Sequence, residues 1–354
     1  GTEISMDDIE TMWVWIPRYS YSIGSEDGTN YFGKQGNYLD TTPTRALPGE
    51  IDVKFVPTYR NDKGTAKYIV SEEIKSNSWY TPDAFTFGDE ELSGIWVGKF
   101  ETSSSNPSTS SGGGNTTELD AMVKPNVTSW RYINVSNAFN VSQKMTDTGN
   151  RYGFTSNVDT YMMKNDEWGT IAYLSQSKYG KLGNNEYSAS NKEVYQNMSN
   201  KFITGCSCGH PSGVISDYGC QYTYDVDKSG TGASTTGTIY GIYDMSGGAW
   251  EYVMGYYYKG DDIFYNPFQL ASKYYNVYES DNVDDACNGG ECLSHALSET
   301  AEWYGDQLAM AFYGQPWILR GGFYGNIYGV GIFYIGSNGG QNNQSYSFRL
   351  VIAP

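Results

Sequence analysis

The sequence lacks any apolar run long enough to span a membrane, and it has no apolar segment typical of a secretory leader. Histidine is scarce, with two residues in 354, His210 and His295, and neither lies in a recognisable nucleophile–base arrangement. We interpret His210 as a loop residue and His295 as a surface or helix position. The sequence therefore predicts neither a membrane-spanning protein nor an enzyme.

Basic residues are also few, and the net charge is −17. An acidic surface repels phosphate backbones and anionic lipids, so we expect neither nucleic acid nor a membrane as a direct partner. The chain begins with Gly1 rather than Met. We therefore expect a mature or trimmed form, with any signal or anchor outside it.

Hydrophobic residues make up only 39% of the chain, but 33 Tyr and 42 Gly compensate with bulky aromatic rings and tight turns. This composition favours short strands and ordered loops over long helices. Strands are expected within residues 11–23, with a break at Pro17, and at 51–70 and 95–102. Residues 24–50 and the Ser/Gly-rich 103–117 are expected to be loops, the latter a flexible one.

Two segments show helical spacing of apolar residues, 130–145 and 165–180. In the second, Asn165 is the expected N-cap, and the acidic residues after it favour the positive end of the helix dipole. Trp168 is expected in the core. No internal repeat and no linker separates the chain into two independent domains.

The five cysteines cannot all pair with one another. Cys287 and Cys292 could close a local disulfide, and either Cys206 or Cys208 could pair with Cys220. Those last three residues with His210 could instead bind zinc, but the spacing is not that of a standard structural site, so no metal is assigned. Residues 225–230 resemble the start of a calcium-binding loop. Such a loop has Glu at its twelfth position, but this position is Thr236 here, so we interpret the stretch as a polar turn.

The C-terminal 35 residues contain two charges, Arg320 and Arg349, where the average of the chain would give about six. Between these arginines lie mainly Tyr, Asn, Ser, Gly, Phe and Ile. Tyr offers a large contact area with few rotatable bonds, and Ser, Gly and Asn offer adaptable hydrogen bonding. We interpret this segment as a recognition surface. The site residues that it predicts are Tyr324, Asn326, Tyr328, Tyr334, Ser337, Asn338, Asn342, Asn343 and Tyr346.

Four motifs resemble the formylglycine-generating-enzyme-like branch of the C-type lectin fold. They are Ile95-Trp-Val-Gly-Lys-Phe-Glu-Thr102, Asn165-Asp-Glu-Trp-Gly-Thr-Ile-Ala-Tyr173, Gly241-Ile-Tyr-Asp-Met-Ser-Gly-Gly-Ala-Trp-Glu-Tyr252 and the pair Arg320-Gly321-Gly322 with Phe348-Arg349. In the third motif Gly248 replaces the usual Asn. The resemblance implies an α+β, C-type-lectin-like fold with short antiparallel sheets, two helices and long loop insertions. Its domain would cover residues 91–354 with a display region at 320–349, and residues 1–90 would form a β-rich N-terminal part that packs on or opens the core.

Within that fold we expect mostly structural roles for the motif residues. Gly247 and Gly248 would allow a tight turn with positive φ, and Trp250 would fill the core. Arg320 and Arg349 would bind loop carbonyls or a buried carboxylate such as Glu251 or Asp244. The oxidase of this family depends on two cysteines that follow its Arg-Gly-Gly motif, and residues 323–328 contain none. Catalysis and a cofactor are therefore not expected, although an oxidase of this type remains an alternative.

The C-terminal segment is also similar to the variable proteins of diversity-generating retroelements. In those proteins, mutagenesis at adenines lets AAY codons encode Asn, Tyr, Ser, Gly, Ile, Phe, Val or Asp, but never Lys, Glu, Gln, Met or Trp. Residues 323–346 contain only amino acids that such codons can encode or fixed positions, and Gln341 and Gln344 would be among the fixed ones. Gly322, Phe333, Gly339 and Gly340 are interpreted as fixed scaffold. An invariant binding site rich in Tyr and Asn would have the same composition.

The sequence thus predicts a surface-displayed or phage-borne protein that binds a ligand or receptor. Its partner would be a protein or glycan on another cell or surface, and its location extracellular, on a cell surface or on a virion. A pilin-like or tip adhesin subunit with this domain as its head is a further alternative. The composition does not identify the ligand.

Overall fold

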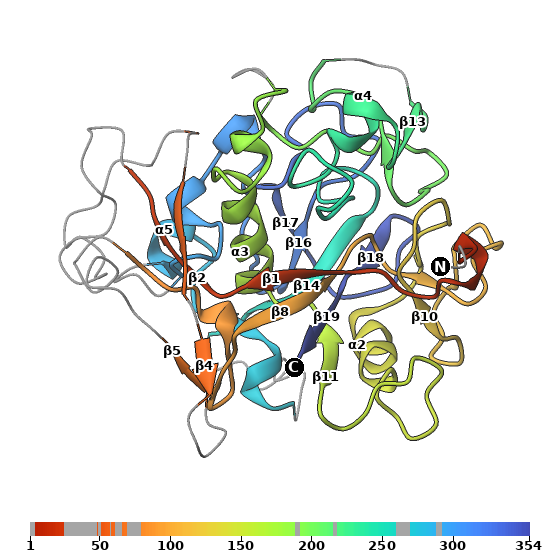
Figure 1. Ribbon diagram of the computed structural model, residues 1–354, viewed down its shortest axis with the longest axis horizontal. Coiled ribbons are helices and arrows are strands. Elements are labelled where there is room, and N and C mark those ends of the chain that lie inside the picture. The colour runs from red at the N-terminus through yellow and green to blue at the C-terminus, as the bar shows by residue number, and fades with distance from the viewer. Residues whose placement is uncertain are drawn as a thin grey trace.

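The computed structural model describes residues 4–24, 48, 51–56, 58–60, 66–68, 79–187, 192–214, 218–259, 270–287 and 292–354. Within them the chain forms short helices and several small sheets (Figure 1). The α+β class predicted from the sequence is therefore confirmed. Most of the loop expected at residues 24–50 lies outside the described residues.

The first sheet has four strands and carries the N- and C-terminal parts of the chain. All of its pairings are antiparallel, and its order is β1 (Trp13–Pro17), β8 (Gly94–Gly98), β19 (Leu350–Ala353) and β11 (Asp159–Met162). Side chains alternate along β8: Ile95 and Val97 are buried, whereas Trp96 faces solvent. The expected break at Pro17 is confirmed, because β1 ends there.

The second sheet positions the C-terminal segment. Its path is β15 (Asn276–Tyr278), β14 (Trp250–Tyr257), β16 (Trp317–Arg320) and β17 (Ile335–Asn338), and β18 (Tyr346–Phe348) pairs in parallel with β14. Glu251 of β14 is opposite Arg320 of β16 and opposite Ser347 of β18. The long strand β14 therefore holds both ends of the segment between Arg320 and Ser347.

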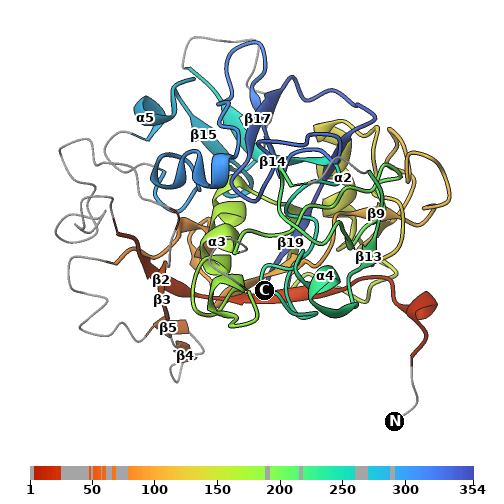
Figure 2. The ribbon, with the colours of Figure 1, turned by 90° about the horizontal axis from the view of Figure 1, so that it is seen from above.

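Five two-stranded sheets complete the described β structure. They are β2 (Tyr19–Ser22) with β3 (Asp52–Phe55), β4 (Thr58–Arg60) with β5 (Ala66–Tyr68), β6 (Thr86–Phe87) with β7 (Glu90–Glu91), β9 (Ser103–Ser104) with β10 (Ala121–Met122), and β12 (Cys206–Ser207) with β13 (Tyr222–Thr223). In Figure 2, β1 runs along one side of the molecule and β17 lies on the opposite side, with β19 and β14 between them.

The described α-helices are α2 (Val135–Lys144), α3 (Asn165–Ser175), α4 (Asp227–Thr231) and α5 (Val283–Ala286). Helix α2 begins later than expected, because the Asn134 side chain caps it by accepting a hydrogen bond from Asn137 N at 2.8 Å. Helix α3 was expected to be capped by Asn165, and this was wrong. Lys164 is its N-cap, and Glu167 Oε2 accepts from Lys164 N at 2.7 Å.

The core is rich in aromatic rings, as the composition suggested. Trp168 of α3 is fully buried, which confirms its predicted place, and its Nε1 donates to the Ile332 carbonyl at 2.7 Å. Tyr19 and Tyr21 of β2 belong to the same buried cluster as Phe348 of β18. The N-terminal strands and the C-terminal segment therefore share one core.

Residues 103–117 differ from the flexible loop expected from their composition. Arg131 N donates to Ser111 O at 2.7 Å, and Trp130 Nε1 donates to Gly114 O at 2.7 Å. Gly113 has φ +158°, and a Cβ on it would lie 2.4 Å from Trp130 Nε1. A packed ring thus orders a Ser/Gly-rich stretch, and the glycine permits its close approach.

Among the described residues, no helix combines the length and the hydropathy that crossing a membrane would need.

Candidate functional site

The C-terminal segment leaves β16 through two glycines with positive φ, Gly321 at +79° and Gly322 at +76°. It passes through residues 323–334, forms β17, turns through residues 339–345 and returns as β18. We call the solvent-accessible residues of 323–328 and 337–346 the C-terminal surface. Its position depends on the contacts at both ends of the segment.

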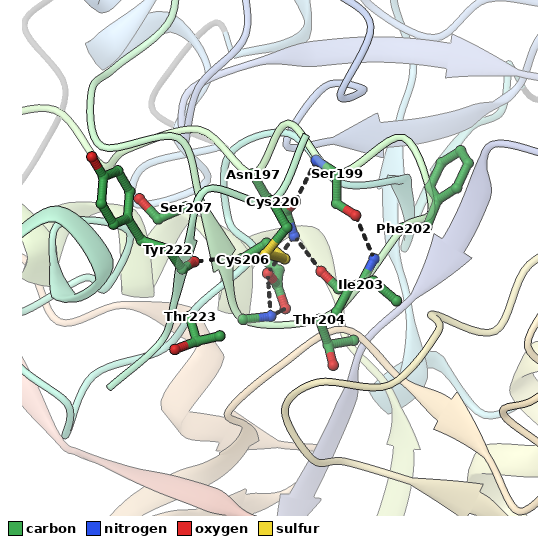
Figure 3. Close-up of a disulfide and its surroundings, with 12 residues drawn as sticks. Asn197, Ser199, Phe202, Ile203, Thr204, Cys206, Ser207, Cys220, Tyr222 and Thr223 are labelled. Carbon is green, nitrogen blue, oxygen red and sulfur yellow. Dashed lines mark hydrogen bonds between the residues drawn. A yellow bond between two sulfur atoms is a disulfide. The ribbon is translucent and has the colours of Figure 1, made fainter. Parts of the chain in front are cut away.

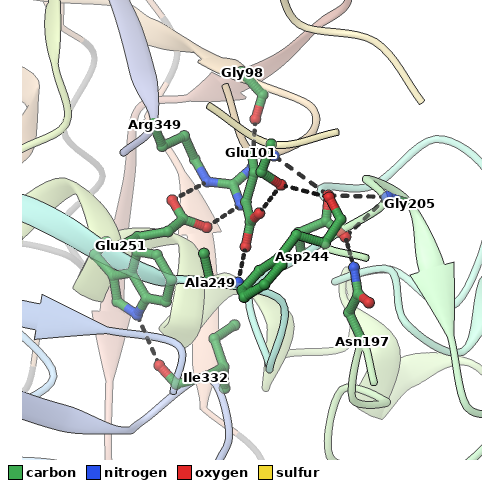
Figure 4. A network of polar contacts seen from close by, with 12 residues as sticks. Gly98, Glu101, Asn197, Gly205, Asp244, Ala249, Glu251, Ile332 and Arg349 are labelled. Carbon is green, nitrogen blue, oxygen red and sulfur yellow. Dashed lines mark hydrogen bonds and ion pairs between the residues drawn. The ribbon is translucent and has the colours of Figure 1, made fainter. Parts of the chain in front are cut away.

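Arg349 anchors the far end of the segment through a fully buried ion pair. Its Nε and NH2 groups donate to Glu251 at 2.9 and 2.5 Å, and NH1 donates to the Gly98 carbonyl at 2.9 Å (Figure 4). This bidentate geometry suits a planar guanidinium. The predicted pairing with Glu251 is confirmed, and it connects the second sheet to β8 of the first.

Two further buried carboxyl groups lie beside this pair. Asp244 accepts from Gly205 N and from Asn197 Nδ2, both at 2.9 Å, and Glu101 Oε1 accepts from Ala249 N at 2.8 Å (Figure 4). Burial, with Asp244 and Glu251 nearby, raises the pKa of Glu101 well above its ordinary value. Burial among other carboxyl groups therefore favours the protonated form of Glu101.

The Glu101 carboxyl group has two further neighbours. Ser129 Oγ donates to Glu101 Oε2 and lies 3.1 Å from the Phe202 carbonyl. Gly248 lies against the same carboxyl group: its φ is +68°, and a Cβ would be 2.4 Å from Glu101 Oε1. The predicted positive φ at Gly247 and Gly248 is confirmed. Both oxygens of the Glu101 carboxyl group have partners within the protein, so we assign this group a structural role.

Arg320 anchors the near end of the segment. Its guanidinium is fully buried and donates to Asn165 Oδ1 at 2.8 Å, to the His295 carbonyl at 2.6 Å and to the Ala296 carbonyl at 3.2 Å. Burial lowers the pKa of Arg320 to about 10. The prediction that this arginine binds loop carbonyls is confirmed.

Trp250, at the start of β14, was expected to fill the core, and this expectation was wrong. It is half-buried, and its ring stacks on Phe323 with 4.7 Å between centroids and 19° between planes. The Tyr346 ring meets it edge-on at 5.6 Å, and its Nε1 donates to the Tyr334 hydroxyl at 3.0 Å. Trp250 therefore joins the two halves of the C-terminal surface.

Eight of the nine predicted site residues are at least partly exposed to solvent. Tyr328 is 76% exposed, and Asn342 is also exposed. The partly exposed residues are Tyr324, Asn326, Ser337, Asn338, Asn343 and Tyr346. Tyr334 contradicts the prediction, because it is 5% exposed and its hydroxyl is the acceptor for Trp250. Tyr334 therefore lies beneath the C-terminal surface and holds Trp250 in place.

The exposed polar groups are partly organised by one another. Asn338 Nδ2 donates to the Tyr346 hydroxyl at 2.7 Å, and the Tyr252 hydroxyl donates to Asn338 Oδ1 at 3.0 Å. Asn326 differs, because its Oδ1 is buried without a hydrogen-bond partner. Phe333, interpreted as fixed scaffold, is buried and packs against Trp303 with 5.1 Å between ring centroids.

Residues outside the segment also support the surface, and the sequence reasoning missed them. Gln196 Nε2 donates to the carbonyls of Asn326 at 2.9 Å and Tyr324 at 3.4 Å. Phe202 meets the Tyr324 ring edge-on at 4.9 Å, with the Arg131 guanidinium 3.7 Å from the centroid of Phe202. No local pattern marks these residues, which approach the segment only in the folded chain.

The cysteines form Cys206–Cys220 and Cys287–Cys292 disulfides, and Cys208 is a buried free thiol. The prediction of disulfides is thus confirmed. Two of the four residues of the zinc alternative, Cys206 and Cys220, are bonded to each other. Among the described residues, no group of three or more His, Cys, Asp and Glu side chains could hold a metal ion.

His295 was expected at the surface or on a helix, and this was wrong. It is 5% exposed, with its Nδ1 2.7 Å from the Tyr278 hydroxyl, and burial lowers its pKa to about 4. His210 lies in a loop, as expected. In the calcium-like stretch, residues 227–231 form α4, and Asp225 Oδ1 accepts from Thr223 Oγ1 at 2.8 Å.

No protein-family model matches the chain, and no curated protein matches it in sequence. One solved structure similar to it is Treponema denticola variable protein 1, with 13% sequence identity and a TM-score of 0.32. That match covers 84% of this chain and 99% of the other.

Proposed function

We propose that this protein binds a ligand through its C-terminal surface, and that the ligand is a protein. The observation that carries this proposal is an uncharged, partly exposed set of Tyr, Asn and Ser side chains on a rigid base. Buried arginine anchors hold the two ends of that set. Such residues provide rigid aromatic contacts and adaptable hydrogen bonds, as in antibody paratopes.

Several features favour a protein ligand over a glycan. The face of the Trp250 ring that stacks on Phe323 is covered and cannot take a sugar ring. Tyr328 and Asn342 instead project as separate exposed side chains. Aromatic anchors of this kind concentrate the binding energy of protein interfaces.

We propose in addition that the fold is C-type-lectin-like and that the C-terminal surface is the diversified region of a retroelement variable protein. The motif resemblance and the amino-acid types at residues 323–346 support this. The two disulfides are typical of proteins in oxidising environments, in agreement with display outside the cell. Sequencing of the flanking DNA tests diversification: a reverse-transcriptase gene and a near-copy of this gene's 3′ end, differing at adenines, are expected.

We propose binding rather than catalysis. The two cysteines that precede the Arg-Gly-Gly motif, Cys287 and Cys292, are bonded to each other. An assay with a cysteine-containing peptide and added copper is expected to show no formylglycine. Formation of that product would replace the binding proposal with the oxidase alternative.

Binding itself is tested on arrays of purified extracellular proteins and of glycans, probed in parallel with the wild type and a Tyr324→Ser/Tyr328→Ser variant. Protein signals that the double variant loses support the proposal. Signals confined to glycans would replace the protein ligand with a sugar. Signals equal for both chains would contradict binding through the C-terminal surface.

A further inference from the structure

A disulfide closes a loop beside the C-terminal surface. Cys206 is fully buried in β12, whereas Cys220 is exposed, just before β13 (Figure 3). The paired strands continue this connection, with Cys206 opposite Thr223. The disulfide therefore holds the two ends of this loop together; its described residues are 207–214 and 218–219.

Two residues of this loop, Gly213 and Tyr218, contact the segment 324–328. Gly213 N donates to the Ile327 carbonyl at 2.6 Å, and a Cβ on Gly213 would lie 3.4 Å from the Tyr328 ring. Tyr218 meets the Tyr324 ring edge-on at 5.9 Å, and its hydroxyl is 3.4 Å from the Gly325 carbonyl. The loop and this half of the C-terminal surface therefore position each other.

Tyr218 is two residues from the disulfide and is 48% exposed. Next to it, Gly219 N donates to the buried Met198 carbonyl at 2.9 Å, so the backbone at this point has a second attachment. A ligand that covers the Tyr324 ring would also meet the ring of Tyr218, because the two are in contact.

We propose that the described part of the loop closed by Cys206–Cys220, residues 207–214 and 218–219, is a second wall of the binding site beside the C-terminal surface: it holds residues 324–328 in place and presents Tyr218 to the protein ligand. The contact role of Tyr218 rests on the proposed function, whereas the positioning role does not. The wall lies outside residues 320–349, so its sequence stays constant if the C-terminal surface varies.

Hydrogen exchange tests the positioning role without any ligand. In a Cys220→Ser variant, the amides of residues 324–328 are expected to exchange at least about tenfold faster, while those of β17 and β18 stay unchanged. The matched control, Cys287→Ala/Cys292→Ala, removes the other disulfide, beside α5, and is expected to leave residues 324–328 unchanged. Unchanged exchange there in Cys220→Ser, or an equal increase in the control, would overturn the positioning role.

The contact role is tested with a display library of this chain, randomised at Tyr324, Asn326, Tyr328, Asn342 and Asn343 and selected against purified lysozyme as a model protein. In the selected binders, Tyr218→Ser is expected to weaken binding at least about tenfold. The control is Tyr240→Ser, a tyrosine that is 76% exposed and lies outside both the C-terminal surface and the Cys206–Cys220 loop. Equal affinities for the two variants would overturn the contact role.

The two experiments separate this inference from the proposed function. A library that yields no binder would count against the binding function and the contact role together. The exchange experiment would still decide whether the loop positions residues 324–328.

Discussion

The ring of Trp250 lies face to face with the ring of Phe323, with 4.7 Å between their centroids. Trp250 begins a strand of the second sheet, and Phe323 is the first residue after the Gly321–Gly322 turn. This stacking fixes the C-terminal surface to the sheet, and it changes what a substitution at Trp250 should do.

We expect Trp250→Ala to lower the free energy of unfolding by about 2 kcal/mol, less than the roughly 3–5 kcal/mol typical of a fully buried aromatic residue. The loss combines the ring stacking with the hydrogen bond to Tyr334. Urea denaturation measures it. Trp250→Phe, which keeps an aromatic ring, should lose less, and a loss above about 4 kcal/mol would place Trp250 in the core after all.

Tyr324→Ser/Tyr328→Ser should bind less but fold normally. Tyr328 is exposed, and such substitutions usually change stability by within about ±0.5 kcal/mol. Tyr324 packs on Phe202 and Tyr218, and losing these ring contacts should cost about 1 kcal/mol, so we expect a total change of about 2 kcal/mol or less. Thermal unfolding and the protein array together check this. Tyr334→Phe is the contrasting variant: it leaves Trp250 Nε1 without its acceptor and should cost about 1 kcal/mol. Severe unfolding of the double variant would show that the surface is part of the core.

Arg349→Met should lower the free energy of unfolding by about 3–5 kcal/mol, because it leaves Glu251 buried without its cation. Adding Glu251→Gln removes that isolated charge. The double variant should therefore be more stable than Arg349→Met alone, as denaturation of the single and double variants would show. A double variant that is less stable by the sum of the two single losses would argue against the ion pair.

Glu299 should make stability fall as the pH rises. It is fully buried, its carboxylate accepts from the hydroxyls of Tyr21 and Tyr173 at 2.7 Å each, and burial raises its pKa from 4.5 to about 7. Because its pKa is higher in the folded state, Glu299 binds its proton more tightly there than in the unfolded state. Protonation of Glu299 therefore stabilises the folded state fully below about pH 4.5, and this stabilisation is lost as the pH rises through about 7.

A Glu299→Gln variant isolates this effect from other titrating groups. The free energy of unfolding of the wild type should fall by ~3 kcal/mol more than that of the variant between pH 4.5 and pH 8. Denaturant titrations at a series of pH values measure the difference. Parallel pH profiles for the two proteins would show that Glu299 does not titrate in this window.

The sequence predicted those features that depend on local pattern or on special side-chain chemistry. The planar donors of Arg320 and Arg349 suggested buried polar contacts, and both form them. The sequence could not separate Tyr334 from Tyr328, because one residue type serves as support at one position and as exposed surface at the other. Neither tyrosine lies in a strand, so the burial of each depends on how the folded loop packs against the rest of the chain.

Other features depend on partners that are distant in sequence. Trp250 looked like a core residue because it is large, but its place at the start of β14 leaves it half-buried. The Ser/Gly-rich stretch looked flexible because Trp130, the ring that orders it, is not part of it. Likewise, nothing near Tyr324 in the sequence indicates Phe202 or Tyr218, which meet it only through the fold.

The position of Glu251 between Arg320 and Ser347 has a practical consequence for engineering. Because both borders of the C-terminal segment pair with one residue of β14, they are separated by two strand spacings, about 10 Å. That gap is set by the sheet and not by the length of chain between the borders. Foreign loops of different lengths could therefore replace the exposed and partly exposed residues 341–344, where β17 and the buried Phe333 are left in place, with the host domain serving as a carrier for inserted peptides.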